Sequence, residues 1–149
     1  MTERPFRIAV GVLALAGIGV AGYLAYARFA DKAISCATGG CETVQSSAYA
    51  DVLGIPVAVI GVAGYLALLA TALSAGETAR LTGAALALAA LVFSAYLLLV
   101  QIFAIGAFCQ WCLVNDVIVA LLAVAAVARL AVPLPRRGAA HRAASDTVV

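Results

Sequence analysis

Long apolar runs separated by short polar breaks dominate the hydrophobic pattern of this chain. Four runs predict helices at about residues 8–27, 55–75, 81–105 and 108–132. Each run reaches the roughly 20 apolar residues that a helix needs to cross a bilayer. The pattern therefore predicts an all-α integral membrane protein, a bundle of four transmembrane helices with a loop or lid at 28–54 between the first two.

Helix-breaking residues mark the ends of these runs. Pro56 near the start of the second run suits the first helical turn, where the amide that proline lacks has no intrahelical partner. Residues 76–78 end that run, residues 106–107 separate the third run from the fourth, and Pro133 prevents further helix. Because these connections are short, consecutive helices are expected to be antiparallel neighbours.

The first run has an alternative interpretation as a cleaved signal peptide. Residues 25–27, Ala-Tyr-Ala, resemble a small-x-small cleavage site. The uncharged run is, however, longer than the roughly 7–15 residues of a signal-peptide core. We therefore expect the first helix to be retained.

Composition supports a membrane protein and narrows the function classes. Of 149 residues, 66% are hydrophobic and 11% are charged, and the mean hydropathy is +1.13. Soluble domains average about 45–50% apolar residues. The net charge is only +2 and the basic residues are scattered, which argues against nucleic-acid binding. The length allows one membrane domain, residues 1–149, and no second domain.

The distribution of basic residues predicts the topology. Arg28 and Lys32 lie on the side of the 28–54 loop. The opposite side carries seven arginines, namely Arg4, Arg7, Arg80, Arg129, Arg136, Arg137 and Arg142. By the positive-inside rule, both termini are expected in the cytoplasm, with the loop and all cysteines on the oxidising side. The tail at 133–149 lacks apolar periodicity and is expected to be disordered, with some attraction to lipid headgroups.

Four cysteines in two close pairs are the main candidates for chemistry. Cys109 and Cys112 form a C-x-x-C at the outer end of the fourth predicted helix, where residues three apart share a face and their sulfurs can bond. The helix N-terminus there favours a reactive thiolate. Cys36 and Cys41 enclose two adjacent glycines, which predicts a flexible, exposed disulfide. The segment 42–54 is expected to lie along the membrane surface as a lid.

Two other uses of the cysteines are open at this point. Both pairs are compatible with structural disulfides that only brace the outer loops of a non-enzymatic membrane protein. Four thiolates also match a tetrahedral zinc site, but such sites normally stabilise small water-soluble modules rather than an oxidising membrane surface. The C-x-x-C spacing favours redox exchange, and we expect no metal.

Three stretches carry a family signature. They are residues 35–49 with the first cysteine pair and two serines after it, residues 54–65 with Gly-Ile-Pro and later glycines, and residues 108–113 around the C-x-x-C. In these stretches the chain resembles bacterial members of the vitamin K epoxide reductase family. The DsbB-type quinone reductases also have four helices and two cysteine pairs, but with the C-x-x-C in the first outer loop. Here the C-x-x-C comes second, which favours the first family.

The resemblance implies a protein dithiol:quinone oxidoreductase of the bacterial cytoplasmic membrane that drives disulfide formation outside the cytoplasm. Cys36 and Cys41 would receive electrons from a DsbA-like thioredoxin-fold protein. That partner is expected to be separate, because many relatives carry such a domain fused at the C-terminus whereas this chain ends at Val149. Cys109 would exchange with the loop, and a quinone of the menaquinone, ubiquinone or vitamin K type would sit beside Cys112. No residue selects an epoxide over a quinone.

Two further residues are candidates for the quinone pocket. The resemblance assigns Ser47 to it, and a helix cap is the alternative role of that serine. Asp116 follows Cys109 and Cys112 on one helical face, and a carboxylate in a membrane segment is a functional candidate. Some family members have tyrosine at this place, and the alternative role of the carboxylate is that of a solvated group or a partner of Asn115. We hypothesise that Asp116 tunes Cys112 or takes up a proton during quinone turnover.

Overall fold

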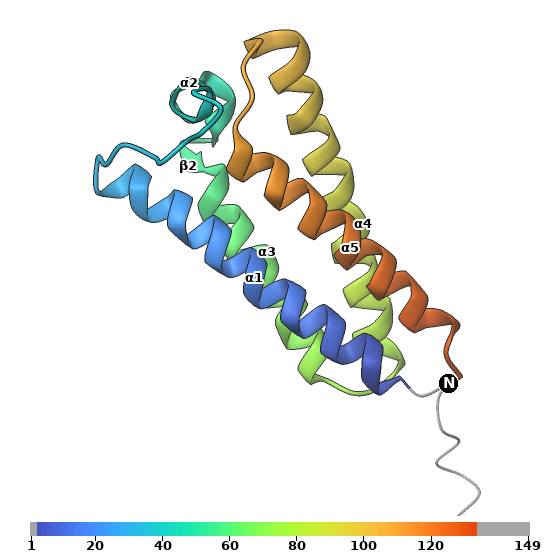
Figure 1. Cartoon of the computed structure of the whole chain (residues 1–149). Helices are drawn as coiled ribbons and strands as arrows, with labels where there is room; N and C mark the ends of the chain where they lie inside the picture. The colour runs from blue at the N-terminus through green and yellow to red at the C-terminus, as the bar shows by residue number, and fades with distance from the viewer. Residues whose placement is uncertain (1–2, 134–149) are drawn as a thin grey trace, which may run out of the picture.

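The computed structural model describes residues 3–133, and most of them are helical (Figure 1). Its elements are, in chain order, α1 (Arg4–Phe29), α2 (Cys41–Gln45), the 3-10 turn η1 (Ala48–Ala50), β1 (Asp51–Val52), β2 (Ile55–Pro56), α3 (Val57–Leu73), α4 (Glu77–Val100), the π-helical turn η2 (Gln101–Ile105) and α5 (Gln110–Ala131). The long helices form a bundle in which α1 packs on α3 and α5, and α4 packs on α3 and α5. The mostly helical fold expected from the apolar runs is therefore confirmed.

Three of the helices are long and apolar enough to cross a membrane. They are α1, α4 together with η2 (Glu77–Ile105), and α5. The apolar helix α3 has 17 residues, which at 1.5 Å per residue corresponds to about 26 Å. This is somewhat less than the roughly 30 Å of a bilayer core. A fourth crossing by α3 therefore stays a prediction.

The start of α3 differs from the sequence expectation for a local reason. Helix was expected from about residue 55, but Ile55 and Pro56 pair with Val52 and Asp51 in a short antiparallel ladder. Gly54, with φ of +80°, permits the tight turn between the two strands. The helix therefore begins only at Val57, with Pro56 as its N-cap.

Two buried arginines satisfy helix carbonyls at the end of the bundle that holds the first residues of α1 and the last of α5 (Figure 1). Arg80 donates to the backbone oxygens of Arg129 and Val132 at the end of α5. Arg129 donates to the backbone oxygen of Thr71 in α3 at 2.9 Å and pairs with Glu3 at 2.7 Å. These contacts provide partners for carbonyls that a helix end leaves free.

Those arginines thus have a packing role besides the topological one assigned from sequence. The predicted side of each terminus depends also on Arg136, Arg137 and Arg142, which lie outside the described residues. The expectation of a disordered tail at 133–149 falls on the same undescribed part, apart from Pro133. Both stay predictions.

Candidate redox site

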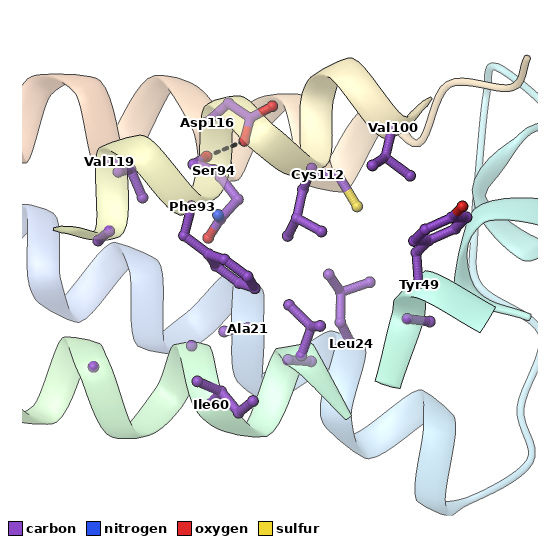
Figure 2. A pocket seen from close by; sticks show the side chains of 18 of the residues that line it. Ala21, Leu24, Tyr49, Ile60, Phe93, Ser94, Val100, Cys112, Asp116 and Val119 are labelled. Carbon is purple, nitrogen blue, oxygen red and sulfur yellow. Dashed lines mark hydrogen bonds between the residues drawn. The ribbon is translucent and has the colours of Figure 1, made fainter. Parts of the chain in front are cut away.

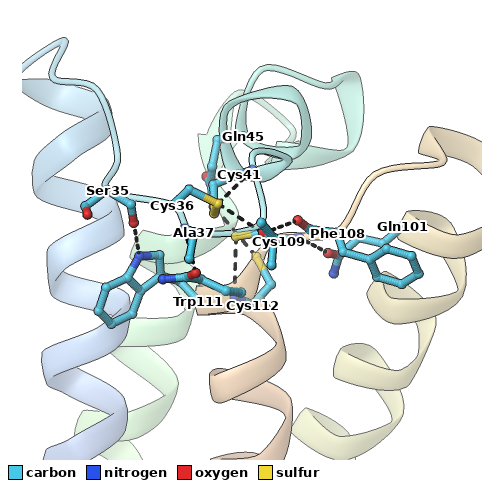
Figure 3. The surroundings of a disulfide bond; sticks show 12 residues. Ser35, Cys36, Ala37, Cys41, Gln45, Gln101, Phe108, Cys109, Trp111 and Cys112 are labelled. Carbon is cyan, nitrogen blue, oxygen red and sulfur yellow. Dashed lines mark hydrogen bonds between the residues drawn. A yellow bond between two sulfur atoms is a disulfide. The ribbon is translucent and has the colours of Figure 1, made fainter.

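All four cysteines meet at the end of the bundle where the loop after α1 covers the start of α5 (Figure 3). Cys36 and Cys41 are joined in a disulfide, and Cys109 and Cys112 are free thiols. Cys41 and Cys109 pack in one buried cluster with Val44, and both cysteines are 0% exposed. The fold therefore brings together two pairs that lie about 70 residues apart in the sequence.

Cys109 lies before the first turn of α5 rather than inside it, as the sequence interpretation had placed it. Its backbone is extended, and its sulfur accepts a hydrogen bond from the backbone N–H of Cys112 at 3.4 Å. The sulfur thus occupies the N-cap position in which Ser or Asp is common. The N–H of Cys109 donates to Oε1 of Gln101 at 3.0 Å. Cys109 is held from both sides, and only Cys112 and Asp116 share a face within α5.

Hydrogen bonds lower the pKa of Cys109 below that of an ordinary cysteine. The hydrogen bond with the Cys112 thiol lowers the pKa of Cys109 to about 6. Burial acts in the opposite direction, and the backbone amides of Cys112 and Trp111 add to the lowering. Near neutral pH a cysteine of low pKa exists as the thiolate, which takes part in disulfide exchange and is also a good leaving group.

We expect a thiolate to appear in this site on raising the pH through about 6. The measurement is thiolate absorbance at 240 nm in a Cys36→Ser/Cys41→Ser variant, which leaves only Cys109 and Cys112. Adding Cys112→Ala removes the main stabilising hydrogen bond and should move the step to higher pH. If the first thiolate formed only with the ordinary cysteine pKa of about 8.5 in the variant that retains Cys112, the assignment would be contradicted.

An apolar cavity of about 380 Å³ lies between the helices next to the cysteines (Figure 2). Its walls come from α1, α3, α4 and α5, and the segment after Cys41 closes part of it. Residues that line it include Leu24, Val44, Tyr49, Ile60, Phe93, Val100, Cys112 and Asp116. Cys112 is the one cysteine among the described lining residues. Its sulfur therefore connects the redox cluster with the cavity.

Ser47 and a neighbouring residue of the predicted lid line the same cavity. The Ser47 hydroxyl donates to the backbone oxygen of Val44 at 2.7 Å. Ser47 precedes η1 but makes no side-chain capping bond to it. Gln45, which sequence analysis treated only as part of the family signature, donates through Nε2 to the sulfur of Cys112 at 3.8 Å. The lid segment thus contacts the cavity-facing thiol directly.

Asp116 lines the cavity one helical turn beyond Cys112. Its Oδ1 accepts a hydrogen bond from the Ser94 hydroxyl of α4 (Figure 2). Its Oδ2 is buried and has no hydrogen-bond partner among the described residues. Asn115, the partner considered from sequence, instead accepts from the Tyr65 hydroxyl at 2.6 Å. Asp116 is therefore partly buried and is not paired with its neighbour Asn115.

Gln101 is a site residue that sequence reasoning missed. Gln101 is 3% exposed and lies in η2, the π-helical turn before the C-x-x-C, and such turns are frequent at functional sites. Gly106, with φ of +68°, ends that turn and lets the chain reverse toward α5. No local pattern marks Gln101 as a partner of Cys109, because the hydrogen bond depends on this reversal.

The observed cysteine pairing bears on the zinc alternative. Cys36 and Cys41 share a disulfide, so their sulfurs are not thiolate ligands. In this state only two thiols remain, fewer than the four ligands of a structural zinc site, and the absence of a metal stays a prediction. The arrangement instead has the parts needed for disulfide exchange.

Comparison with known protein families gives a match over most of the chain. The model of the vitamin K epoxide reductase family matches residues 8–127. The matched range runs from the first turns of α1 into the last part of α5 and includes both cysteine pairs and the cavity-lining residues. The match agrees with the resemblance noted from the motifs alone.

Proposed function

Since the chain belongs to the vitamin K epoxide reductase family, an oxidoreductase family, we propose that it is a membrane thiol oxidase that transfers electrons from a thioredoxin-fold protein to a quinone. One observation carries the proposal. Cys109 packs with the Cys36–Cys41 disulfide on one side and hydrogen-bonds Cys112 on the other, and Cys112 lines an apolar cavity. This arrangement supports a relay from the loop to the cavity.

The proposed relay is a series of thiol–disulfide exchanges. A thiolate of the partner attacks Cys36 and forms a mixed disulfide, which releases Cys41 as a thiolate. Cys41 attacks Cys109 of a closed Cys109–Cys112 disulfide, and the electron pair of the broken bond leaves on Cys112. The partner's second thiol then releases Cys36 and leaves the partner oxidised. Cys36 next attacks Cys41, which closes the loop disulfide again and frees Cys109.

The state with a closed loop disulfide and two C-x-x-C thiols is the one that follows these exchanges. A bound quinone would accept two electrons and two protons from the pair, and the Cys109–Cys112 disulfide would close again. The cavity fits such a ring, because its lining is largely apolar and a thiol, an amide and a carboxyl group reach it. Cys112 donates the electrons, and Gln45 holds its sulfur at the cavity edge.

The membrane topology follows as part of the proposal. The cysteine end and the end that holds the first residues of α1 lie at opposite ends of the bundle (Figure 1). With four crossings and both termini in the cytoplasm, the cysteines face the oxidising side of a bacterial cytoplasmic membrane. Cys36 is the half-exposed member of the loop disulfide. A soluble thioredoxin-fold protein would therefore reach the disulfide through Cys36 on that side of the membrane.

The direct test is anaerobic mixing of the purified full chain with a reduced thioredoxin-fold protein and, in turn, menaquinone, ubiquinone and a vitamin K analogue. We expect quinone absorbance to fall in proportion to the partner disulfide that forms. Omitting either the thiol protein or the membrane protein is the control. Absence of quinone reduction with every pair of substrates would contradict the proposed function.

Asp116 is proposed to supply a proton during quinone reduction, since its Oδ2 has no hydrogen-bond partner within residues 3–133 and it lines the cavity with Cys112. Asp116→Asn keeps an oxygen that accepts from Ser94 but removes the acid. General acids contribute typically about 10²–10⁴-fold, so we expect roughly 10²-fold slower quinone reduction in the variant and a changed pH–rate profile. Val114→Ala on the exposed side of α5 is the control. An unchanged rate across pH would remove this role.

A further inference from the structure

We propose that Gln110 and Trp111, the two residues between the cysteines of the C-x-x-C, dock the disulfide loop on the start of α5 and thereby set Cys41 against Cys109. The inference rests on the proposed relay and concerns its inter-pair step. It assigns Gln110 and Trp111 as positioning residues, because neither side chain contains an atom whose bonds change.

Both side chains hydrogen-bond the loop backbone from α5, and Figure 3 shows the bond between Trp111 and Ser35. Oε1 of Gln110 accepts from the N–H of Ala37 at 2.9 Å. The indole Nε1–H of Trp111 donates to the backbone oxygen of Ser35 at 2.8 Å. The two bonds hold the loop immediately before and immediately after Cys36. They therefore orient the first cysteine of the disulfide relative to α5.

A second set of contacts holds the loop between its two cysteines. The hydroxyl of Thr38 donates to the backbone oxygen of Phe108 at 3.0 Å. At Gly40, an added Cβ would lie 2.5 Å from the same oxygen, so the loop backbone touches the residue before Cys109. Only glycine allows this approach, and Cys41 follows directly. The close contact brings the second cysteine of the disulfide to Cys109.

Trp111 is itself fixed by α1. Its ring lies 5.1 Å from the ring of Tyr23, measured between centroids. The Tyr23 hydroxyl accepts from the N–H of Ser35 at 3.2 Å, so the same loop residue is held by both aromatic side chains. The two glycines in the loop predicted a flexible disulfide, whereas this loop is docked on two helices. Docking restricts the relative positions of the two sulfurs and so keeps them close to the geometry in which they react.

The step that docking assists is the transfer between pairs. Formation of the Cys41–Cys109 bond breaks the Cys109–Cys112 bond, and the electron pair leaves on Cys112, which then takes up a proton. Attack requires the entering sulfur to approach the disulfide, and small misplacements slow such reactions by up to about 10²-fold. Loss of docking should therefore slow this step without changing the thiols themselves.

The test uses a Cys36→Ser/Cys112→Ser background of the full chain, in which Cys41 and Cys109 are the remaining thiols. Oxidised glutathione is added, and the intramolecular Cys41–Cys109 link is followed by peptide mass after alkylation. We expect Gln110→Ala with Trp111→Phe to slow link formation about 10-fold. In a protein with Trp111 intact, Gln110→Glu keeps an oxygen acceptor and should therefore retain most of the rate of link formation that Gln110→Ala loses.

Val114→Ala, an exposed residue of the same helix, is the matched control, and far-UV circular dichroism checks that each variant is folded. An unchanged rate of link formation in the variant that carries both Gln110→Ala and Trp111→Phe would overturn the docking proposal while leaving the relay intact. If no link forms in the background protein itself, the relay and the docking both fail. A link that slows equally in Gln110→Ala and Gln110→Glu would also contradict docking through the hydrogen bond of Gln110.

Discussion

Cys112→Ala is expected to abolish quinone reduction in a bundle that remains folded. Cys112 is the one cysteine among the described residues that line the cavity, so no other sulfur delivers electrons to a ligand there. Loss of a residue that forms the reacting bond typically costs on the order of 10⁴-fold or more. Fold should persist, because alanine favours helix and the backbone N–H that Cys109 caps is retained. Quinone absorbance and circular dichroism measure the two effects.

The same variant separates the enzyme from its main alternative. A protein whose disulfides only brace outer loops has no quinone activity to lose, and in that case the unsubstituted chain is also inactive. Val114→Ala, exposed on the same helix, should retain full activity. Retained quinone reduction in Cys112→Ala would show that electrons reach the acceptor by a route that does not involve this thiol.

Gly17→Ala should be strongly destabilising, whereas Gly19→Ala in the same helix should not be. A Cβ at Gly17 would lie 2.3 Å from ring atoms of Tyr65, which is 4% exposed and whose hydroxyl is held by its hydrogen bond to Asn115. Overpacking of this kind costs about 1–3 kcal/mol or more. At Gly19 a Cβ meets nothing within 4 Å, and replacing helical glycine by alanine favours the helix by up to about 1 kcal/mol.

Thermal unfolding in mild detergent measures this pair of variants, with Gly19→Ala as the matched control. The effect should extend to the site, because Tyr65 lines the cavity and its hydroxyl donates to Asn115 at 2.6 Å. A shifted ring is therefore also expected to lower the affinity for the quinone that is proposed to bind there in Gly17→Ala. Equal unfolding temperatures for the two variants would show that α1 and α3 do not pack through Gly17.

Much of the fold could be predicted because its signals are local. Apolar runs, proline and glycine breaks and the C-x-x-C spacing each depend on a few neighbouring residues. They indicated the helices to within a few residues and identified both cysteine pairs. The start of α3 was less predictable, since Ile55 and Pro56 are drawn into a ladder with β1 instead of the helical turn.

The candidate site could be predicted only as a set of residues. Its arrangement depends on contacts between segments far apart in the chain, such as Ala37 with Gln110 and Gln45 with Cys112. A glutamine or tryptophan carries no local mark of such a role. The unpartnered oxygen of Asp116 is equally invisible in the sequence, because it depends on which helix faces Asp116.

The sequence by itself determined the chain's helical character, the membrane-compatible length of three helices and which thiols are available, because hydrophobic period and covalent composition are properties of neighbouring residues. Only the tertiary structure decided that Cys41 and Cys109 share one buried cluster, that Cys109 caps α5, and that Cys112 faces a cavity. Those features depend on how the helices pack and where the loop docks. Packing and docking result from many weak contacts between residues that are far apart in the sequence.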